Sequence, residues 1–148
     1  MLVLVDTNVL LRTAKPDDSD HAVALEALSH LTAHGHEPAF VPQSAFEYYV
    51  VATRPIAQNG LGLDPVDAIR DLDELLRLYR FMRGDGEVFE EWKELVKTHS
   101  VRGKTAHDAR LVAAMRHHGI SDLLTFNVSD FRRYEPNIQS HDPRNMTA

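Results

Sequence analysis

The chain has 148 residues, of which 43% are hydrophobic, and this predicts one globular domain spanning residues 1–148. It contains no cysteine, which excludes disulfides and thiolate metal sites, and no long apolar stretch or basic leader, so we expect a cytoplasmic protein with no membrane partner. Its 16 basic and 22 acidic side chains give a formal charge of −6, which argues against holding nucleic acid on a broad basic surface.

The N-terminal stretch joins an apolar run to a carboxylate. Residues Leu2–Val5 are continuously apolar, which is typical of a strand buried on both faces of a parallel sheet. Asp6 follows directly, at the position where open α/β sheets bind their ligands. Asp is also a favoured N-cap, so Asp6 can equally begin a helix at Thr7. Residues 9–11 are expected to form a short turn. This stretch alone leaves both roles open.

The rest of the chain alternates between helical and strand-like patterns. Apolar spacing, caps and breakers predict longer helices at residues 20–34, 43–53, 65–79, 87–98 and 106–118. Short apolar runs predict strands at 38–42, 80–82, 122–126 and 138–140, and a short helix is expected at 131–134. The helix at 87–98 carries Phe89, Trp92 and Val96 on one face. We therefore predict an α/β fold with a short parallel central sheet and helices on both faces.

Four acidic residues occupy comparable places in this pattern. Asp6 and Asp130 lie just beyond predicted strands, and Glu47 and Asp108 lie in the first turns of predicted helices. Because the carboxyl ends of parallel strands meet at one edge of a sheet, we expect all four side chains at that edge. Asp130 can also be a surface residue in the opening turn of the helix at 131–134.

Helix capping is the alternative role for the other three acids. Asp6 can be an N-cap, as described above. Ser44 and Glu47 have the spacing of a capping box, in which the two side chains satisfy the first N–H groups of a helix. Asp108 follows Thr105 at the same spacing, which also favours a helix start. Each acid therefore has a structural explanation when it is considered singly.

Taken together, the four acids predict a specific chemistry. Carboxylates that crowd together repel one another, and without a cation some of them must take up protons. A hard divalent ion such as Mg²⁺ or Mn²⁺ relieves this repulsion, because it prefers oxygen ligands. Two such ions about 3.5–4 Å apart can clamp a phosphodiester and activate water, so no serine or histidine nucleophile is needed.

The four acids lie in four motifs along the chain: Val5-Asp6-Thr7-Asn8-Val9-Leu10, Ser44-x-x-Glu47, His107-Asp108-Ala109 and Leu124-Thr125-Phe126-Asn127-x-x-Asp130-Phe131. This ordered set resembles the successive motifs of the PIN-domain ribonucleases. The resemblance covers essentially the whole chain.

The resemblance implies roles for individual residues. Three acids are expected to surround Mg²⁺, with Mn²⁺ able to substitute: Asp6, Glu47 and Asp108. Many members carry a fourth acid two residues after the threonine, where this chain has Asn127, so Asp130 is expected to serve instead. Three polar side chains are expected to support the acids or orient the substrate: Asn8, Thr125 and Asn127.

Size and the lack of other domains make the chain similar to the VapC-type toxins of bacterial type II toxin–antitoxin pairs. This similarity implies an endoribonuclease that cuts RNA by metal-activated water, forms a homodimer and is covered by a cognate antitoxin. The charge of −6 suits a basic antitoxin arm. Apolar residues that could form a groove for it, or belong to the core, are Leu28, Phe46, Tyr49 and Val50.

Several cations near the predicted edge could contact RNA phosphates, or could be ordinary solvated surface charges: Arg12, Lys15, Arg102, Lys104, Arg110, Arg132 and Arg133. Such contacts would position the RNA without reading its sequence.

Two other classes of function stay open. A metal-dependent phosphatase or receiver-like phosphoryl-transfer protein also has an Asp after its first strand, but a phosphatase would carry Asp-x-Asp where this chain has Asp6-Thr7-Asn8. A non-catalytic binding module would use the acids only as caps and surface charge. The nine histidines lack the His-Glu-x-x-His spacing of a zinc hydrolase, which leaves them as surface or loop residues.

Overall fold

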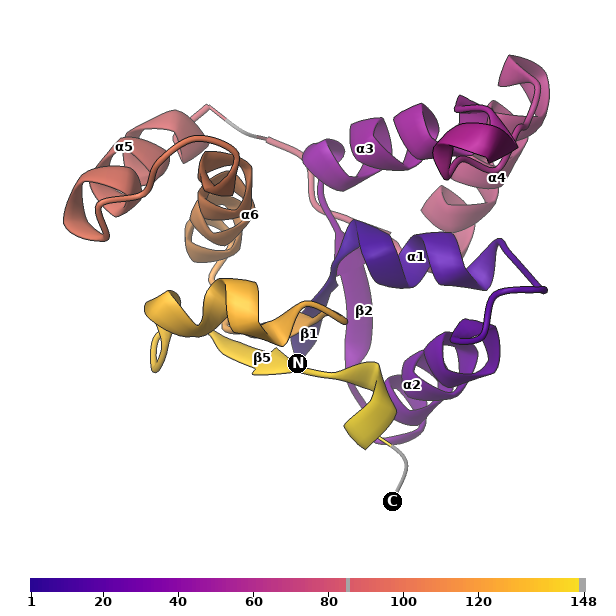
Figure 1. Ribbon diagram of the computed structural model, residues 1–148. Helices are drawn as coiled ribbons and strands as arrows, with labels where there is room; N and C mark the ends of the chain where they lie inside the picture. The colour runs from indigo at the N-terminus through magenta and orange to yellow at the C-terminus, as the bar shows by residue number, and fades with distance from the viewer. Residues whose placement is uncertain (85, 147–148) are drawn as a thin grey trace.

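The computed structural model describes residues 1–84 and 86–146 and contains one parallel sheet of five strands. The strands are β1 (Leu2–Val5), β2 (Glu37–Phe40), β3 (Arg80–Phe81), β4 (Asp122–Leu124) and β5 (Gln139–His141). They lie in the order β3-β2-β1-β4-β5, so β1 is the central strand (Figure 1). The prediction of a short parallel sheet within an α/β fold is confirmed.

Helices cover both faces of this sheet. The α-helices are α1 (Thr7–Thr13), α2 (His21–Ala33), α3 (Pro42–Thr53), α4 (Pro65–Leu78), α5 (Val88–Thr98) and α6 (Thr105–His117). Three short 3-10 helices complete the fold: η1 (Ile56–Gln58), η2 (Val128–Tyr134) and η3 (Pro143–Asn145). Helices α1 to α4 gather on one side of β1 and β2, whereas α5 and α6 pack together on the other side (Figure 1). No helix in the described part of the chain combines the length and apolarity that a membrane crossing requires.

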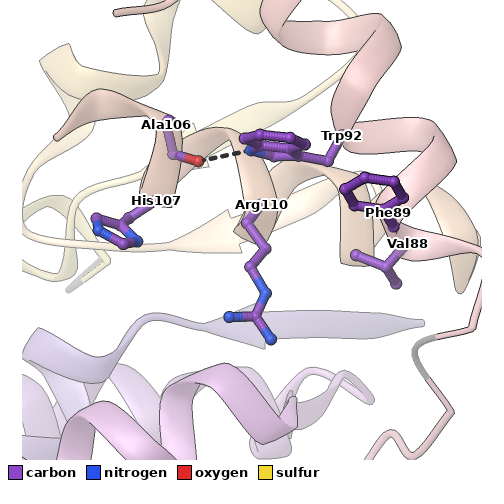
Figure 2. Close-up of a pocket in the computed structure, with 6 residues that line it drawn as sticks. All are labelled: Val88, Phe89, Trp92, Ala106, His107 and Arg110. Atoms are coloured by element: carbon purple, nitrogen blue, oxygen red, sulfur yellow. Dashed lines mark hydrogen bonds between the residues drawn. The ribbon is translucent and has the colours of Figure 1, made fainter. Parts of the chain in front are cut away.

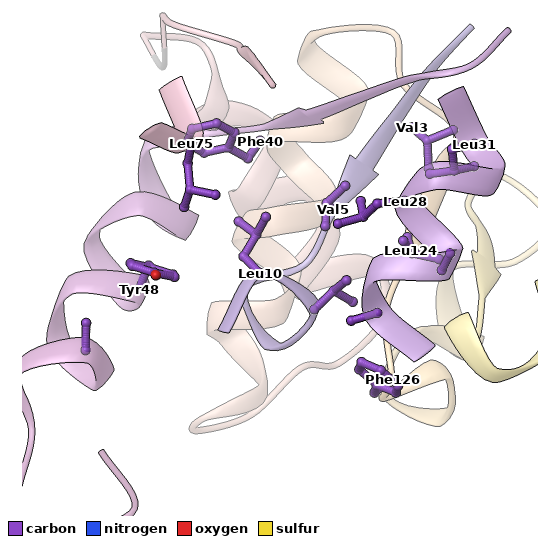
Figure 3. Close-up of a cluster of buried hydrophobic side chains, with 14 of the residues drawn as sticks. Val3, Val5, Leu10, Leu28, Leu31, Phe40, Tyr48, Leu75, Leu124 and Phe126 are labelled. Atoms are coloured by element: carbon purple, nitrogen blue, oxygen red, sulfur yellow. The ribbon is translucent and has the colours of Figure 1, made fainter. Parts of the chain in front are cut away.

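Alternation along β1 divides the interior into two cores. Successive side chains of a strand point to opposite faces. Val3 and Val5 therefore pack with α1 to α4, in the cluster that Figure 3 shows, whereas Leu4 packs with α5 and α6. All three side chains are almost fully buried. The continuous apolar run that predicted a strand covered on both faces thus serves two cores at once.

The register of the sheet brings two loops together at its carboxyl edge. Val5 pairs with Leu124, and the Asp6 N–H donates to the Leu124 carbonyl at 2.9 Å. The chain leaves both strands at this level, so Asp6 and the segment after Leu124 emerge side by side. Strand β4 is two residues shorter than predicted, because Thr125 and Phe126 already belong to this edge segment.

The expected turn at residues 9–11 is instead part of α1. Asp6 is the N-cap of this helix, and its side chain accepts a hydrogen bond from the Thr7 N–H at 2.7 Å. Val9 and Leu10 are fully buried in the first core, which holds this short helix against the sheet. The capping role considered for Asp6 is therefore confirmed, and it leaves the second carboxylate oxygen for other partners.

Candidate active site

Asp6 is held at the sheet edge by a set of donors. In addition to the Thr7 N–H, the Thr125 hydroxyl donates to Asp6 Oδ2 at 2.8 Å, and the Asn8 amide reaches the same oxygen at 3.4 Å. Asn8 also joins the two loops, because its Oδ1 accepts from the Phe126 N–H at 3.3 Å and its Nδ2 donates to Thr125 Oγ1 at 3.3 Å. The carboxylate therefore has a fixed position and orientation.

Burial makes the charge of Asp6 unfavourable despite these donors. It raises the pKa of Asp6 from 3.8 to about 6, against the opposing hydrogen bonds from Thr125 and Thr7. The negative charges of Glu47 and Asp108 raise the pKa further. A carboxyl group in this state is stabilised either by a proton or by a nearby cation.

Glu47 is fixed from two sides. The Thr7 hydroxyl donates to Glu47 Oε2 at 2.9 Å, and the Gln43 amide donates to Oε1 at 2.9 Å. The same amide group donates to the His107 carbonyl at 3.0 Å, which ties the start of α3 to the first turn of α6. Both oxygens of Glu47 thus have hydrogen-bond partners that fix the position of the carboxylate.

The capping box predicted for Glu47 is wrong. Helix α3 begins with Val41 as its N-cap and Pro42 in its first turn, one turn earlier than the box requires. Ser44 lies inside the helix and is fully buried, and its hydroxyl has no hydrogen-bond partner among the described residues. The side chain of Glu47 therefore does not cap the helix.

Asp108 enters from the opposite side of the sheet, in the first turn of α6. The N-cap of α6 is Lys104, which makes no side-chain capping bond, and the Thr105 hydroxyl donates to the Arg102 carbonyl. The spacing of Thr105 and Asp108 therefore does not form a cap. Partial burial, followed by the charges of Asp130 and Glu47, raises the pKa of Asp108, while His107 and Arg133 oppose this effect.

The structure brings three of the four predicted acids to one cavity. A cavity of about 470 Å³, here called the acidic edge cavity, is lined by three of them together with Asn127: Asp6, Glu47 and Asp108. Its other walls are Thr7, Asn8, Leu11, Phe46, Val50, Val51 and Arg54. Asp130 stands outside this lining, exposed in the first turn of η2, and acts on the site through its charge near Asp108.

These donors are of the kind that a hard cation binds. Every candidate ligand is a carboxylate oxygen. Burial is the main cause of the raised pKa values of Asp6 and Asp108, and a divalent ion offsets the mutual repulsion that adds to it. Within residues 1–84 and 86–146, no three acidic or histidine side chains are already grouped as the ligands of one ion. By its chemistry, the set of three carboxylates that lines the acidic edge cavity fits a hard divalent cation.

Two further residues organise this site, and their roles were not predicted from the sequence: Thr7 and Gln43. Gln43 stands four residues before Glu47, so the two share a face of α3, and that spacing was available in the sequence. The bond from Thr7 to Glu47 spans 40 residues and depends on how α1 packs against α3. No local pattern could have predicted it.

The cations and apolar residues near the edge differ in their availability. Arg12 is held by Asp18 at 2.9 Å and Asp20 at 3.8 Å, so it is less suited to bind RNA than expected. The predicted groove residue Leu28 belongs to the buried core, with 4% of its surface exposed. Phe46 and Val50 remain 65% and 55% exposed beside the acidic edge cavity.

Comparisons with known proteins agree with this architecture. Residues 3–135 match the family model of the PIN domain. A comparison with curated proteins finds no match.

Among solved structures, VapBC-1 from nontypeable Haemophilus influenzae aligns with a TM-score of 0.70 at 14% identity, over 97% of this chain and 98% of that chain. VapBC2 from Rickettsia felis, bound to a promoter DNA fragment, gives 0.68 at 16% identity, over 96% and 98% of the two chains. VapC20 from Mycobacterium tuberculosis, described as a toxin that cleaves the sarcin-ricin loop, gives 0.60 at 19% identity, over 82% and 86%. At such low identity these likenesses establish a common fold.

Proposed function

Because the chain belongs to the PIN-domain family, we propose that it is a metal-dependent endoribonuclease whose active site is the acidic edge cavity. The observation that carries the proposal is that Asp6, Glu47 and Asp108 line one cavity, where burial and, to a smaller extent, the charges of the other two acids raise the pKa of Asp6. The proposed cofactor is Mg²⁺, with Mn²⁺ as a substitute, because hard ions prefer an all-oxygen donor set.

In this proposal the chain's own residues fix the position of the cation ligands. Thr125 and Asn8 hold Asp6, and Thr7 and Gln43 hold Glu47, as the hydrogen bonds above describe. Asp108 supplies the ligand from α6. Asp130 is the fourth acid and adds negative charge beside Asp108, while Asn127 on the cavity wall contacts the substrate.

When bound, a divalent cation supplies a water molecule of lowered pKa and offsets the charge of the phosphodiester. The acids act as ligands, so none of them forms a covalent bond to RNA. The products we propose are a 5′-phosphate and a 3′-hydroxyl. Exposed cations around the edge position the backbone through its phosphates: Arg102, Lys104, Arg110, Arg132 and Arg133.

We further propose that the enzyme is a VapC-type toxin with a cognate antitoxin and a homodimeric assembly. The folds that support this assignment come from VapBC structures, and one similar chain is described as a sarcin-ricin loop cleaving toxin. Phe46 and Val50 have exposed apolar side chains beside the acidic edge cavity. A partner that packs on these side chains would also cover the acids.

Cleavage of RNA tests the enzymatic proposal. The wild-type protein should cut RNA in the presence of Mg²⁺, and addition of EDTA should abolish the cleavage. The substitutions Asp6→Asn and Asp108→Asn should each abolish it as well. Asp73→Asn is a matched control, because Asp73 is an exposed acid on α4, outside the residues that line the acidic edge cavity, and should cut as wild type. Cleavage that survives EDTA contradicts the proposal, and hydrolysis of a small phosphate ester without RNA cleavage favours the phosphatase alternative.

A metal titration separates an enzyme site from a binding module with acidic caps. Mn²⁺ at about 100 times its dissociation constant should stabilise the folded protein by roughly 2.7 kcal/mol. The same titration of Asp6→Asn should give a much smaller shift in melting temperature, whereas Asp73→Asn should respond as wild type. An equal response of all three proteins would show that the acids do not hold the metal.

Growth tests the assignment as a toxin. Expression of the chain should arrest growth, and co-expression of the neighbouring reading frame should relieve the arrest. Asp108→Asn should be harmless when expressed alone. Arrest by this variant as strong as by the wild type would separate toxicity from the acidic site.

A further inference from the structure

A second cavity lies between α5 and α6, next to the proposed active site. It has a volume of about 400 Å³ and is here called the aromatic cavity (Figure 2). Six residues line it: Val88, Phe89, Trp92, Ala106, His107 and Arg110. The volume lies within the range of about 300–1,000 Å³ that ligand pockets occupy.

Two aromatic rings give this cavity flat walls. Phe89 and Trp92 stack with ring centroids 5.9 Å apart and planes inclined by 22°. The Trp92 indole N–H donates to the Ala106 carbonyl at 2.9 Å, which fixes the ring between the two helices (Figure 2). Phe89 remains 58% exposed and belongs to neither core, whereas Val88 beside it is buried. The Lys93 ammonium lies 5.1 Å from the centroid of the Phe89 ring, so a planar ligand that stacks on Phe89 displaces an exposed side chain and leaves the core unchanged.

Cationic and donor groups complete the lining from α6. His107 and Arg110 both face the cavity and are exposed to solvent. The ion pairs among the described residues do not include either side chain. The Arg110 guanidinium can only donate hydrogen bonds, so it suits the carbonyl and ring-nitrogen acceptors of a base or the oxygens of a phosphate.

Neighbouring residues and one hydrogen-bonded side chain link the walls of the aromatic cavity and the acidic edge cavity. His107 precedes Asp108 in the first turn of α6, and its carbonyl accepts from the Gln43 amide that also holds Glu47. The buried side chain of Gln43 thus joins a wall residue of the aromatic cavity to an acid of the acidic edge cavity. Gln43 also lines a smaller cavity that shares Arg110 with the aromatic cavity, and its buried Oε1 has no hydrogen-bond partner among the described residues.

We propose that the aromatic cavity binds an unpaired base of the RNA, next to the phosphodiester that is cut. The proposal rests on the proposed ribonuclease function and specifies its substrate as a single-stranded or unpaired segment. Aromatic rings bind unpaired bases by stacking, and adjacent cations hold the backbone. A paired base keeps its faces against its neighbours and cannot enter.

Trp92 is the only tryptophan of the chain, so its fluorescence reports on this cavity alone. The binding test uses the full-length Asp6→Asn variant in EDTA and adds a single-stranded oligoribonucleotide that contains all four bases. A stacked base should quench the emission. An oligomer of the same length with abasic sugars should leave the emission unchanged, because it keeps the phosphates but lacks the bases.

Phe89→Ala is the informative substitution, because Phe89 is largely exposed and its loss should spare the fold. It should weaken RNA binding by about 5- to 150-fold, the range for loss of one stacked aromatic. In the active protein it should raise KM by a similar factor, while the thermal shift with Mn²⁺ stays unchanged. Leu78→Ala is the matched control, because Leu78 is also 58% exposed but lies on α4. It should change neither quantity.

Each result has a distinct meaning. Equal quenching by the abasic oligomer would overturn the inference in favour of a phosphate contact, and a response to N-acetylphenylalanine amide but not to RNA would assign the cavity to a protein partner. RNA cleavage with an unchanged KM in Phe89→Ala would overturn the inference while the ribonuclease proposal stands. Base-dependent quenching by a wild-type protein that cuts no RNA would overturn the proposed function and leave the base site in place.

Discussion

The acids at the sheet edge are held in two different ways. Asp6 and Glu47, here called the held half, lie beside the core of α1 to α4, and every oxygen of their carboxylates accepts a hydrogen bond. Asp108 and Asp130, the open half, come from α6 and η2 beside the second core. Burial and neighbouring charges set the pKa of Asp108, without any hydrogen bond to its carboxylate from a described residue.

This difference suggests how the site is assembled. The held half has a fixed geometry in the absence of a ligand, because its donors belong to rigid elements packed on β1. The open half is positioned by backbone alone, with Gln43 as the side chain that links the start of α3 to α6. A cation between the halves would join two separately packed sides of the sheet. We therefore expect substitutions in the two halves to have different consequences.

The largest expected effect is at the centre of the held half. Asp6→Asn should lower the rate of RNA cleavage by more than about 100-fold, because even loss of a group that only supports a metal ligand costs 10–100-fold. The same variant should be more stable than the wild type near neutral pH, since it removes a buried charge. Cleavage assays and urea unfolding on one preparation measure both changes. A variant that lost activity and stability together would instead have a damaged fold.

The pH dependence of stability should be dominated by the same residue. The pKa of Asp6 is raised to about 6, so the folded protein binds this proton more tightly than the unfolded chain does. Stability should therefore fall as pH rises from about 4 to above 6, by at most about 3 kcal/mol from this group at 1.36 kcal/mol per unit. Urea unfolding across this range should show a clearly flatter profile for Asp6→Asn. Identical profiles would mean that folding does not raise the pKa of Asp6.

The sequence predicted the scaffold of this site better than its internal contacts. The apolar run at Leu2–Val5 and the polar residues after it placed Asp6 at the sheet edge, because burial and strand polarity are local properties. The role of Ser44 was misjudged, because its spacing to Glu47 suits a capping box and only the packing of α3 shows that the hydroxyl is buried one turn inside the helix.

Contacts between distant segments were beyond a local pattern. Thr7 reaches Glu47 across the interface of α1 and α3, and no spacing rule relates the two residues. Phe89 and Trp92 were correctly placed on one helix face, but whether that face is covered depends on how far α6 reaches along α5. The identity of the fourth acid stays a prediction, since Asp130 is exposed and Asn127 lines the cavity.

Loss of a hydrogen bond to Glu47 should lower RNA cleavage less than loss of one of the acids. Thr7→Val keeps the shape of the side chain but removes the hydroxyl that donates to Glu47 Oε2. We expect a 10–100-fold loss of cleavage, the usual range for a group that orients a metal ligand, with a matching loss of Mn²⁺ affinity. Thr53→Val is the control, because the Thr53 hydroxyl bonds only the Tyr49 carbonyl within α3. Equal activity of both variants would show that the site does not depend on this bond.

The smallest expected effect lies in the open half. Asp130 is exposed and raises the pKa of Asp108 through space, so Asp130→Asn should lower the pKa of Asp108. If ionised Asp108 is required, the acid limb of the kcat/KM profile should move to lower pH in the variant, while activity at the optimum falls less than about tenfold, because solvent screens exposed charges. Asp142→Asn removes a partly exposed acid at the N-cap of η3, outside the lining of the acidic edge cavity, and should leave the limb unchanged. A loss for Asp130→Asn as large as that for Asp6→Asn would instead make Asp130 a full ligand, and the open half would then close on the cation when it binds.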